Sequence, residues 1–266
     1  MAFVPTAAHA LNDVPAYWHR CHGKALETDA HECVLGDTSG RATRTIALVG
    51  DSATGAWMIP LDAIGKARHW KIITVLHTLC TWTAAMTVHP LVGPGPYTAC
   101  HTWGENAQRF LLALKPDVVI SSDRPKVRTP TTPGGSTAAS TAVGRGMAVY
   151  WRQLLAAHIA VVAIRETPEP GRDEPQCLEA HSVASCSTPR SVAIAKITPV
   201  TVADAAVNGR ATLIDLNRLI CSAWCSPVVG NVEVYRDAHH MTQTFALTLA
   251  PYLERALLKV PALANG

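Results

Sequence analysis

The segment TIALVGDSATGAW, residues 45–57, places a carboxylate and a hydroxyl directly after a short apolar run. Ser52 could act as a nucleophile, or it could cap the helix that follows by accepting a hydrogen bond from that helix's first amides. A helix starting near Ser52 would direct its amides and positive dipole end toward whatever this serine attacks. Taken alone, the segment favours the capping role.

A nucleophilic serine needs a base, and the segment VYRDAHHMT, residues 234–242, offers one. Asp237 and His240 are three residues apart, so on a helical turn their side chains share one face. The carboxylate could then hold the imidazole in one tautomer while its other nitrogen faces the serine. A structural hydrogen bond between the two is the plainer explanation of this spacing. A metal site made of Asp237, His239 and His240 is also conceivable, although adjacent histidines usually point apart.

The elements that must position these residues follow an alternating pattern. Short apolar runs rich in β-branched residues predict five buried strands, at 45–50, 71–76, 117–121, 159–164 and 211–216. Helix-compatible stretches lie between and after them, at 56–70, 106–115, 148–158 and 242–260, the last with an internal proline that should kink or break it. Apolar strands that alternate with helices indicate an α/β fold with a parallel sheet covered on both faces.

Ligands of an open parallel sheet bind outside the carboxyl ends of the strands, where Ser52 is expected to lie. Three segments are poor in regular structure: 1–43, 124–146 and 165–190. We interpret residues 1–43 as an N-terminal linker region and residues 44–260 as the catalytic domain. The Pro/Gly/Thr-rich segment 124–146 could shape a cleft there, together with Trp57, Trp82 and Trp103, although each tryptophan is more typical of a core.

The composition and net charge indicate a globular chain and argue against a nucleic-acid partner. The 266 residues are 48% hydrophobic and 16% charged, which indicates a globular chain long enough to bury a substantial core. The formal charge of +3 is too small to indicate a nucleic-acid partner, and the sequence implies no cofactor.

The eight cysteines fall into four local pairs, which favours disulfide bonds and an oxidising compartment. Zinc is the rival interpretation, but the sequence has no C-x-x-C pair and its spacings differ. The N-terminus lacks the features of a secretory signal, and no apolar run is long enough to cross a membrane. An oxidised domain of this kind is expected to be part of a larger exported or membrane-anchored protein. The pairs are Cys21 and Cys33, Cys80 and Cys100, Cys177 and Cys186, and Cys221 and Cys225.

GDS at 50–52 together with D-x-x-H at 237–240 resembles the SGNH (GDSL-type) hydrolase superfamily. The ordered series LVGDSATGAW, KIITVLHTLCTW, KPDVVISS, AHIAVVAIRETPEP, LIDLNRLICSAWC and VYRDAHHMTQTFALTLAPYL is more specific. It resembles the SGNH domain fused behind the membrane portion of acyltransferase-3 type O-acyltransferases, over roughly residues 20–258. The resemblance implies a three-layer α/β/α sandwich, SGNH/flavodoxin-like, with a central parallel sheet of about five strands.

The resemblance also assigns roles. It implies that Ser52 is the nucleophile, His240 the general base and Asp237 its orienting carboxylate, with Asp51 a structural residue at the turn. The sequence departs from the family where an oxyanion-binding asparagine is expected, because it reads SSDRPK after the third strand, and the glycine expected after KIITVL is absent. The Ser52 amide then remains as a donor, with Ser122 and, more weakly, Asn106 as further candidates.

The implied activity is transfer of an acyl group, most simply acetyl, to a cell-envelope glycan or glycolipid through a Ser-His-Asp acyl-enzyme mechanism. The partners would be an acyl donor, the glycan acceptor and a fused membrane portion, and the domain would be extracytoplasmic, on the periplasmic or cell-surface side. A stand-alone carbohydrate or small-ester esterase and a catalytically weak glycan-binding module remain as alternatives. A Ser52 hydroxyl occupied as a helix cap would favour the binding module.

Overall fold

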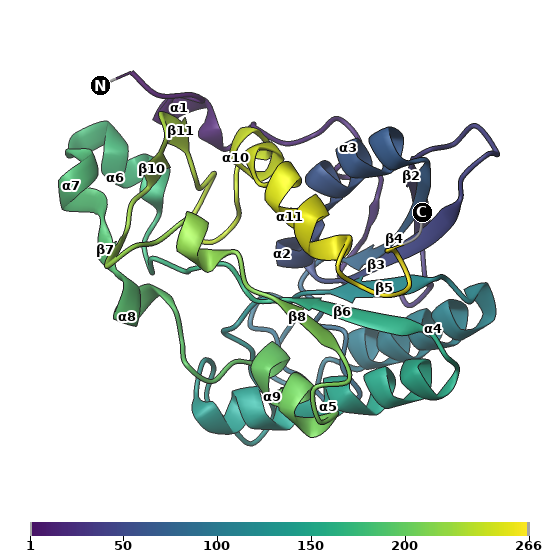
Figure 1. The fold of residues 1–266 in the computed structure, drawn as a ribbon. Helices are drawn as coiled ribbons and strands as arrows, with labels where there is room; N and C mark the ends of the chain where they lie inside the picture. Colours follow the sequence, from purple (N-terminus) through teal and green to yellow (C-terminus); the bar gives the residue numbers. More distant parts are fainter. Residues whose placement is uncertain (1, 265–266) are drawn as a thin grey trace.

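The structure is a computed structural model that describes residues 2–264, and its centre is a seven-stranded sheet (Figure 1). Six strands run parallel in the order β1-β4-β3-β5-β6-β8, and β2 pairs antiparallel with β4. The five predicted strands are confirmed as β3, β4, β5, β6 and β8. The strands are β1 (His22–Gly23), β2 (Glu32–Gly36), β3 (Arg44–Gly50), β4 (Trp70–His77), β5 (Val118–Ser121), β6 (Ala160–Ile164) and β8 (Thr212–Ile214).

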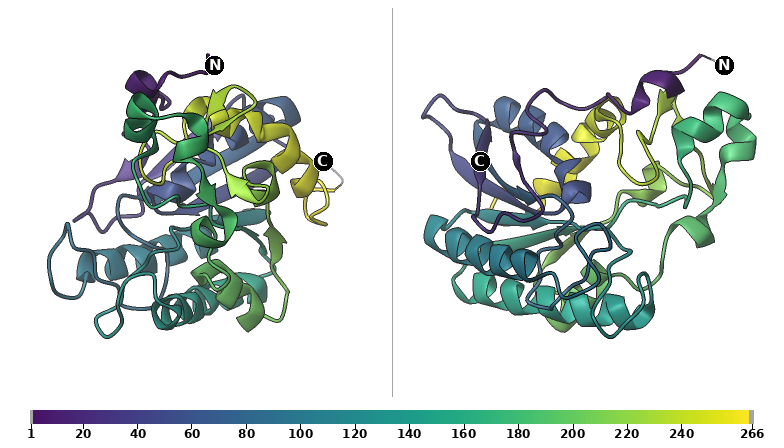
Figure 2. Two further views of the ribbon diagram at one scale, coloured as in Figure 1. Left: turned by 90° about the vertical axis from the view of Figure 1, so that its left-hand side faces the viewer. Right: turned by 180° about the vertical axis from the view of Figure 1, so that it is seen from behind.

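Helices cover both faces of this sheet, so the predicted α/β sandwich is confirmed (Figures 1 and 2). On one face lie α3 (Met58–Arg68), α10 (Gln243–Thr248) and α11 (Ala250–Leu257), and on the other lie α4 (Thr98–Leu114), α5 (Thr137–Ala156) and α9 (Pro199–Ala206). Neighbouring strand residues enter opposite layers: Ile46 and Leu48 pack in the first, and Ala47 and Val49 in the second. Strands that are apolar throughout are therefore needed to fill both layers.

The order of the strands creates a crevice beside β3. The chain passes from β3 to β4 on one side and then returns to β5 on the other side of β3. The carboxyl ends of β3 and β5 thus flank a topological switch point, the usual place for a ligand in an open α/β sheet.

Several elements differ from the sequence-based expectations. The segment 124–146 is irregular only in its first part, because α5 begins at Thr137, one residue after Ser136 caps it. Residues 22–36, which the sequence placed in the linker region, supply β1 and β2 to the sheet. The last helix is broken as predicted: α10 ends at Thr248, and Pro251 lies in the first turn of α11.

Short elements complete the chain outside the two helical layers. Within 165–190 the structure has two short helices and the first strand of a two-stranded pair, although this segment was predicted to be poor in regular structure. The remaining elements are α1 (Ala7–Ala10), α2 (Ser52–Gly55), α6 (Glu174–Ala180), α7 (Val183–Cys186), β7 (Thr188–Pro189), α8 (Arg190–Ala193), η1 (Asn217–Leu219), β9 (Trp224–Cys225), β10 (Val228–Val229) and β11 (Val232–Glu233).

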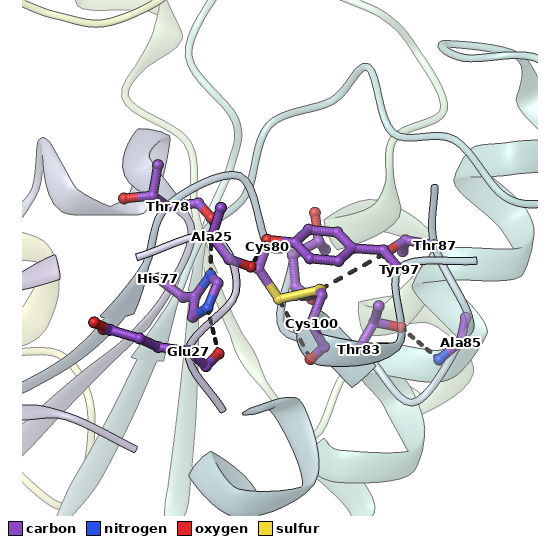
Figure 3. The surroundings of a disulfide bond; sticks show 11 residues. Ala25, Glu27, His77, Thr78, Cys80, Thr83, Ala85, Thr87, Tyr97 and Cys100 are labelled. Carbon is purple, nitrogen blue, oxygen red and sulfur yellow. Dashed lines mark hydrogen bonds between the residues drawn. A yellow bond between two sulfur atoms is a disulfide. The ribbon is translucent and has the colours of Figure 1, made fainter. Parts of the chain in front are cut away.

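The cysteines pair locally as the spacing predicted, so no cysteine of the described chain remains free for zinc. Figure 3 shows Cys80–Cys100, which joins the loop after β4 to α4, with Thr87 donating a hydrogen bond toward Cys100 Sγ. In the same view the Tyr97 hydroxyl donates to the Ala25 carbonyl. These contacts fix the loop between β4 and α4. The other bonds are Cys21–Cys33, Cys177–Cys186 and Cys221–Cys225.

Among residues 2–264, no helix combines the length and the apolar character that crossing a membrane requires.

Candidate active site

The turn after β3 depends on a glycine. Gly50 has a φ of +150°, and a Cβ atom there would lie 2.2 Å from Thr54 Oγ1 and 2.8 Å from the Ser122 carbonyl oxygen. The Thr54 hydroxyl donates a hydrogen bond to that carbonyl, so α2 is tied to the end of β5. Only a residue without a side chain fits between these groups.

Asp51, and not Ser52, caps the helix that follows. Asp51 Oδ1 accepts hydrogen bonds from the amides of Ala53 at 2.9 Å and Thr54 at 3.1 Å, and Oδ2 accepts from the Arg124 amide at 3.0 Å. Burial raises the pKa of Asp51, whereas these amides lower it. Because Asp51 satisfies the amides, the Ser52 hydroxyl is left for another partner.

That partner is His240. His240 Nε2 lies 2.8 Å from Ser52 Oγ, and His240 Nδ1 lies 2.7 Å from Asp237 Oδ2. The other oxygen of Asp237 accepts hydrogen bonds from the amides of His239 and His240, at 2.9 and 2.8 Å. In a neutral imidazole whose Nδ1 donates to the carboxylate, Nε2 accepts a hydrogen bond from the Ser52 hydroxyl. The structure therefore brings the three predicted residues into one chain of hydrogen bonds.

Charge effects reinforce this arrangement. Burial raises the pKa of Asp237, but the hydrogen bond and charge of His240 and the amides of His239 and His240 outweigh it, so the net pKa is lowered. Asp237 is thus held as a carboxylate beside His240.

The metal interpretation uses the same residues. One ligand atom each of Asp237, His239 and His240 lies within 4.8 Å of the others. However, both ring nitrogens of His240 are already in hydrogen bonds, one of them with Ser52. The His239 ring lies against the His240 ring, with centroids 4.0 Å apart, and burial together with the charges of His240 and Arg124 lowers the pKa of His239 to about 3. This geometry fits a serine–histidine pair better than a metal centre.

Ser52 and His240 open onto a cavity of about 400 Å³. Its walls come from the turn after β3, the loop after β4, the segment after β5 and the loop that carries His240. The first three lie at the carboxyl ends of parallel strands, as predicted for the site. The lining residues are Asp51, Ser52, Leu79, Thr81, Thr87, Val88, His89, Pro90, Leu91, Arg124, Lys126, Val127, Arg128, His239 and His240.

Other residues considered from the sequence lie outside this cavity. Ser122 is buried and supports α2 through its carbonyl group. Asn106 points elsewhere, because its side-chain amide donates to the Thr28 carbonyl at 2.7 Å and accepts from Arg109. This placement gives Asn106 no part in binding an oxyanion at Ser52. Trp57, Trp82 and Trp103 are core residues, each at most 1% exposed.

Sequence reasoning missed the cations of the cavity. Arg124, Lys126 and Arg128, which we call the basic wall, all line it and belong to the irregular segment after β5. A signal was present, because the pattern R-x-K-x-R begins three residues after the end of a predicted strand, at the edge of the sheet where ligands bind. His89, which lines the cavity from the loop after β4, had no comparable signal in the sequence.

Comparison with known proteins shows which family the chain matches. A family model described as "SGNH domain (fused to AT3 domains)" matches residues 20–255. No curated protein sequence matches the chain significantly.

Among solved structures, the periplasmic domain of a lipopolysaccharide acetyltransferase from Salmonella ser. Paratyphi A has a TM-score of 0.65 at 13% identity. That match covers 96% of this chain and 98% of the other, and it shows a shared fold. A Bacteroides fragilis protein described as an acylhydrolase gives 0.48 at 12% identity, covering 92% and 95% of the two chains. An acetyl xylan esterase gives 0.42 at 12% identity, covering 80% and 98%.

Proposed function

The chain belongs to the family of SGNH domains that are fused to AT3 domains, and from that premise we propose that it is a serine-dependent O-acyltransferase. In this proposal Ser52 carries an acyl group, most simply acetyl, as a covalent ester. The acceptor is a hydroxyl of a cell-envelope glycan or glycolipid. The structural relatives support an acyl-transfer or esterase enzyme.

One observation carries the proposal: the hydrogen-bond chain from Asp237 through His240 to Ser52 ends at a cavity. A glycan-binding module has no need of a serine hydroxyl aligned with an imidazole. Because Asp51 satisfies the amides of α2, the Ser52 hydroxyl does not serve as the cap that would favour such a module.

The geometry suggests the following steps. His240 Nε2 accepts the proton of the Ser52 hydroxyl while Oγ attacks the carbonyl carbon of the donor ester. The donor's alkoxide leaves with the proton that His240 returns, and the acyl group stays on Ser52. An acceptor hydroxyl then gives its proton to His240 and attacks the carbonyl carbon of the acyl-enzyme; the bond to Ser52 Oγ breaks, and His240 returns the proton to Oγ, which restores the Ser52 hydroxyl. Asp237 orients the imidazole throughout and stabilises its positive charge.

Stabilisation of the tetrahedral oxyanion rests on few donors. The Ser52 amide occupies the first helical position of α2, where no carbonyl of the same helix can accept from it. We assign it as one donor. The asparagine that the family places after the third strand is missing, and loss of one donor costs on the order of a hundredfold in rate. We therefore expect slow turnover on simple esters.

The location follows from the same evidence. Four disulfides indicate an oxidising compartment, and the acetyltransferase relative is described as a periplasmic domain. We propose that this domain is extracytoplasmic and that it works beside an AT3 membrane portion, which would supply the acyl group.

The test is time-resolved release of nitrophenol from 4-nitrophenyl acetate, together with mass spectrometry of the intact protein. We expect an acetyl adduct on Ser52, and a fall of about a thousandfold or more in rate for Ser52→Ala and His240→Ala. Ser222→Ala and His181→Ala, at exposed positions, are the matched controls. Wild-type activity no greater than that of Ser52→Ala, with no adduct, would overturn the proposal.

Added glycan acceptors separate transfer from hydrolysis. Acceleration of nitrophenol release, with acetylated glycan as product, is expected for a transferase. Turnover with free acetate as the sole product would instead establish a stand-alone esterase.

A further inference from the structure

The cavity beside Ser52 has an uneven charge. Three cations line it, and the one carboxylate among its lining residues is Asp51. Both oxygens of Asp51 face backbone amides, so this carboxylate is committed to the turn after β3. Nothing among the lining residues offers the basic wall a free negative charge.

One carboxylate behind the cavity compensates the basic wall in part. Glu169, 4% exposed, accepts from Arg124 Nε at 2.8 Å and pairs with Lys126 Nζ at 3.0 Å. Its single charge is shared by two cations. Within residues 2–264, no ion pair or side-chain hydrogen bond engages the Arg128 guanidinium. Glu169 is therefore shared by two cations, and the positive charge of the basic wall is only partly compensated by ion pairs.

The neighbouring histidines do not add to this charge at neutral pH. Burial, followed by the charges of Arg124 and Arg128, lowers the pKa of His89. Burial also lowers the pKa of His239, to about 3, with His240 and Arg124 contributing. Arg124 contributes to both shifts, so the positive charge of the basic wall acts on both histidines.

The basic wall is also fixed in place, unlike a solvated surface loop. The Arg124 amide donates to Asp51, the Val88 amide donates to the Arg128 carbonyl at 3.1 Å, and the Gly135 amide donates to the Val127 carbonyl at 3.1 Å. Val127 itself is buried in the core. The backbone between the three cations is therefore held from both sides.

A glycine makes room for the outermost cation. A Cβ atom on Gly134 would lie 2.8 Å from both Cγ and Nε of Arg128. The aliphatic stem of Arg128 thus lies flat against the backbone at Gly134, which orients its guanidinium.

We propose that the basic wall is a subsite for an oxyanion, a carboxylate or a phosphate, on the glycan whose hydroxyl is acylated at Ser52. This inference rests on the proposed function and names its acceptor class: an acidic glycan in place of a neutral one. Guanidinium groups bind both anions in the same bidentate way, so the two acids share one chemistry.

Binding to a catalytically inactive protein tests the subsite independently of turnover. We would measure the affinities of glucose, glucuronate and glucose 6-phosphate for Ser52→Ala by calorimetry at low and high salt. The three sugars differ only at one carbon, so their comparison isolates the anionic group. We expect at least one anion to bind about tenfold or more tightly than glucose, with the advantage reduced by salt. The tighter anion identifies the source as a carboxylate or a phosphate.

Variants of the basic wall test whether its cations cause the preference for anionic sugars. Lys126→Gln and Arg128→Gln, each combined with Ser52→Ala, should remove most of the preference for the anionic sugars. Arg145→Gln, an exposed arginine of α5 outside the cavity lining, is the matched control. Equal affinities for the three sugars, or a preference that survives both variants, would overturn the subsite.

The two proposals fail in different ways. Absence of a Ser52 adduct in the wild type contradicts acyl transfer, whereas the sugar affinities of Ser52→Ala stay unaffected by that result. A normal adduct with no preference for anionic sugars contradicts only the subsite.

Discussion

The two walls of the cavity are held by different kinds of contact. The catalytic wall, made of Asp51, Ser52, His239 and His240, is held mainly by carboxylates that accept hydrogen bonds from backbone amides two or three residues away, with one further bond from the Arg124 amide to Asp51. The basic wall rests on distant partners. Glu169 lies 45 residues after Arg124 in the sequence, and the Val88 amide, which donates to the Arg128 carbonyl, lies 40 residues before Arg128.

This difference matches what each wall has to do. Asp51 and Asp237 accept hydrogen bonds from backbone amides, which the fold already holds in place. Fixing these two side chains therefore orders no second side chain and costs little further conformational entropy. A proton transfer between Ser52 and His240 needs that fixed geometry. Long cationic side chains keep more freedom, and Lys126 is half exposed, but attraction to an anion tolerates such variation in position.

The largest effect is predicted for a change in Asp237, the carboxylate that orients His240 in the catalytic wall. In Asp237→Asn, the new amide would face His240 Nδ1 and favour the tautomer whose Nε2 carries a proton and cannot accept one from Ser52. We expect kcat for nitrophenyl acetate to fall by about a thousandfold or more, with KM and Tm little changed. Asp29→Asn, at an exposed position, is the control. A loss below tenfold would show that Asp237 does not set the tautomer.

The same contrast explains what the sequence could predict. Ser52, Asp237 and His240 belong to short local motifs, and an apolar run typical of a buried strand precedes Ser52. Both the residues of the site and the edge of the sheet where they lie could therefore be predicted from the sequence. The cysteine pairs are local as well. The backbone amides that hold Asp237 lie within three residues of it in the sequence, so a short motif is enough to predict this part of the site.

The basic wall could not be predicted in the same way. Its segment was interpreted as poor in regular structure, and nothing in the sequence links Arg124 to Glu169 or Arg128 to Val88. The strands β1 and β2 were missed for a similar reason, because they are short and pair with β4 residues that lie 35 to 54 positions later in the chain. Contacts that depend on tertiary packing override local pattern.

A smaller effect should appear where the walls meet, at His239. Its unfolded pKa is near 6.5 and its folded pKa about 3, so between these values the unfolded chain binds the extra proton and stability falls as pH falls. His239→Gln should therefore lose less stability than the wild type between pH 6.5 and pH 4, by about 5 °C or more in Tm. Thermal melts across this range, with His181→Gln as control, check the expectation. Parallel curves for wild type and His239→Gln would contradict it.

The smallest effect tests whether the basic wall needs geometry as well as charge. Gly134→Ala keeps all three cations but places a methyl group against the stem of Arg128, which must move. If the position of the guanidinium matters, the ratio of glucuronate to glucose affinity in Ser52→Ala should fall about two- to threefold. Gly95→Ala is the control, because a Cβ atom there meets nothing within 4 Å. A ratio unchanged by Gly134→Ala but lost in Arg128→Gln would mean that charge alone suffices, and that the basic wall attracts its ligand without holding it in one orientation.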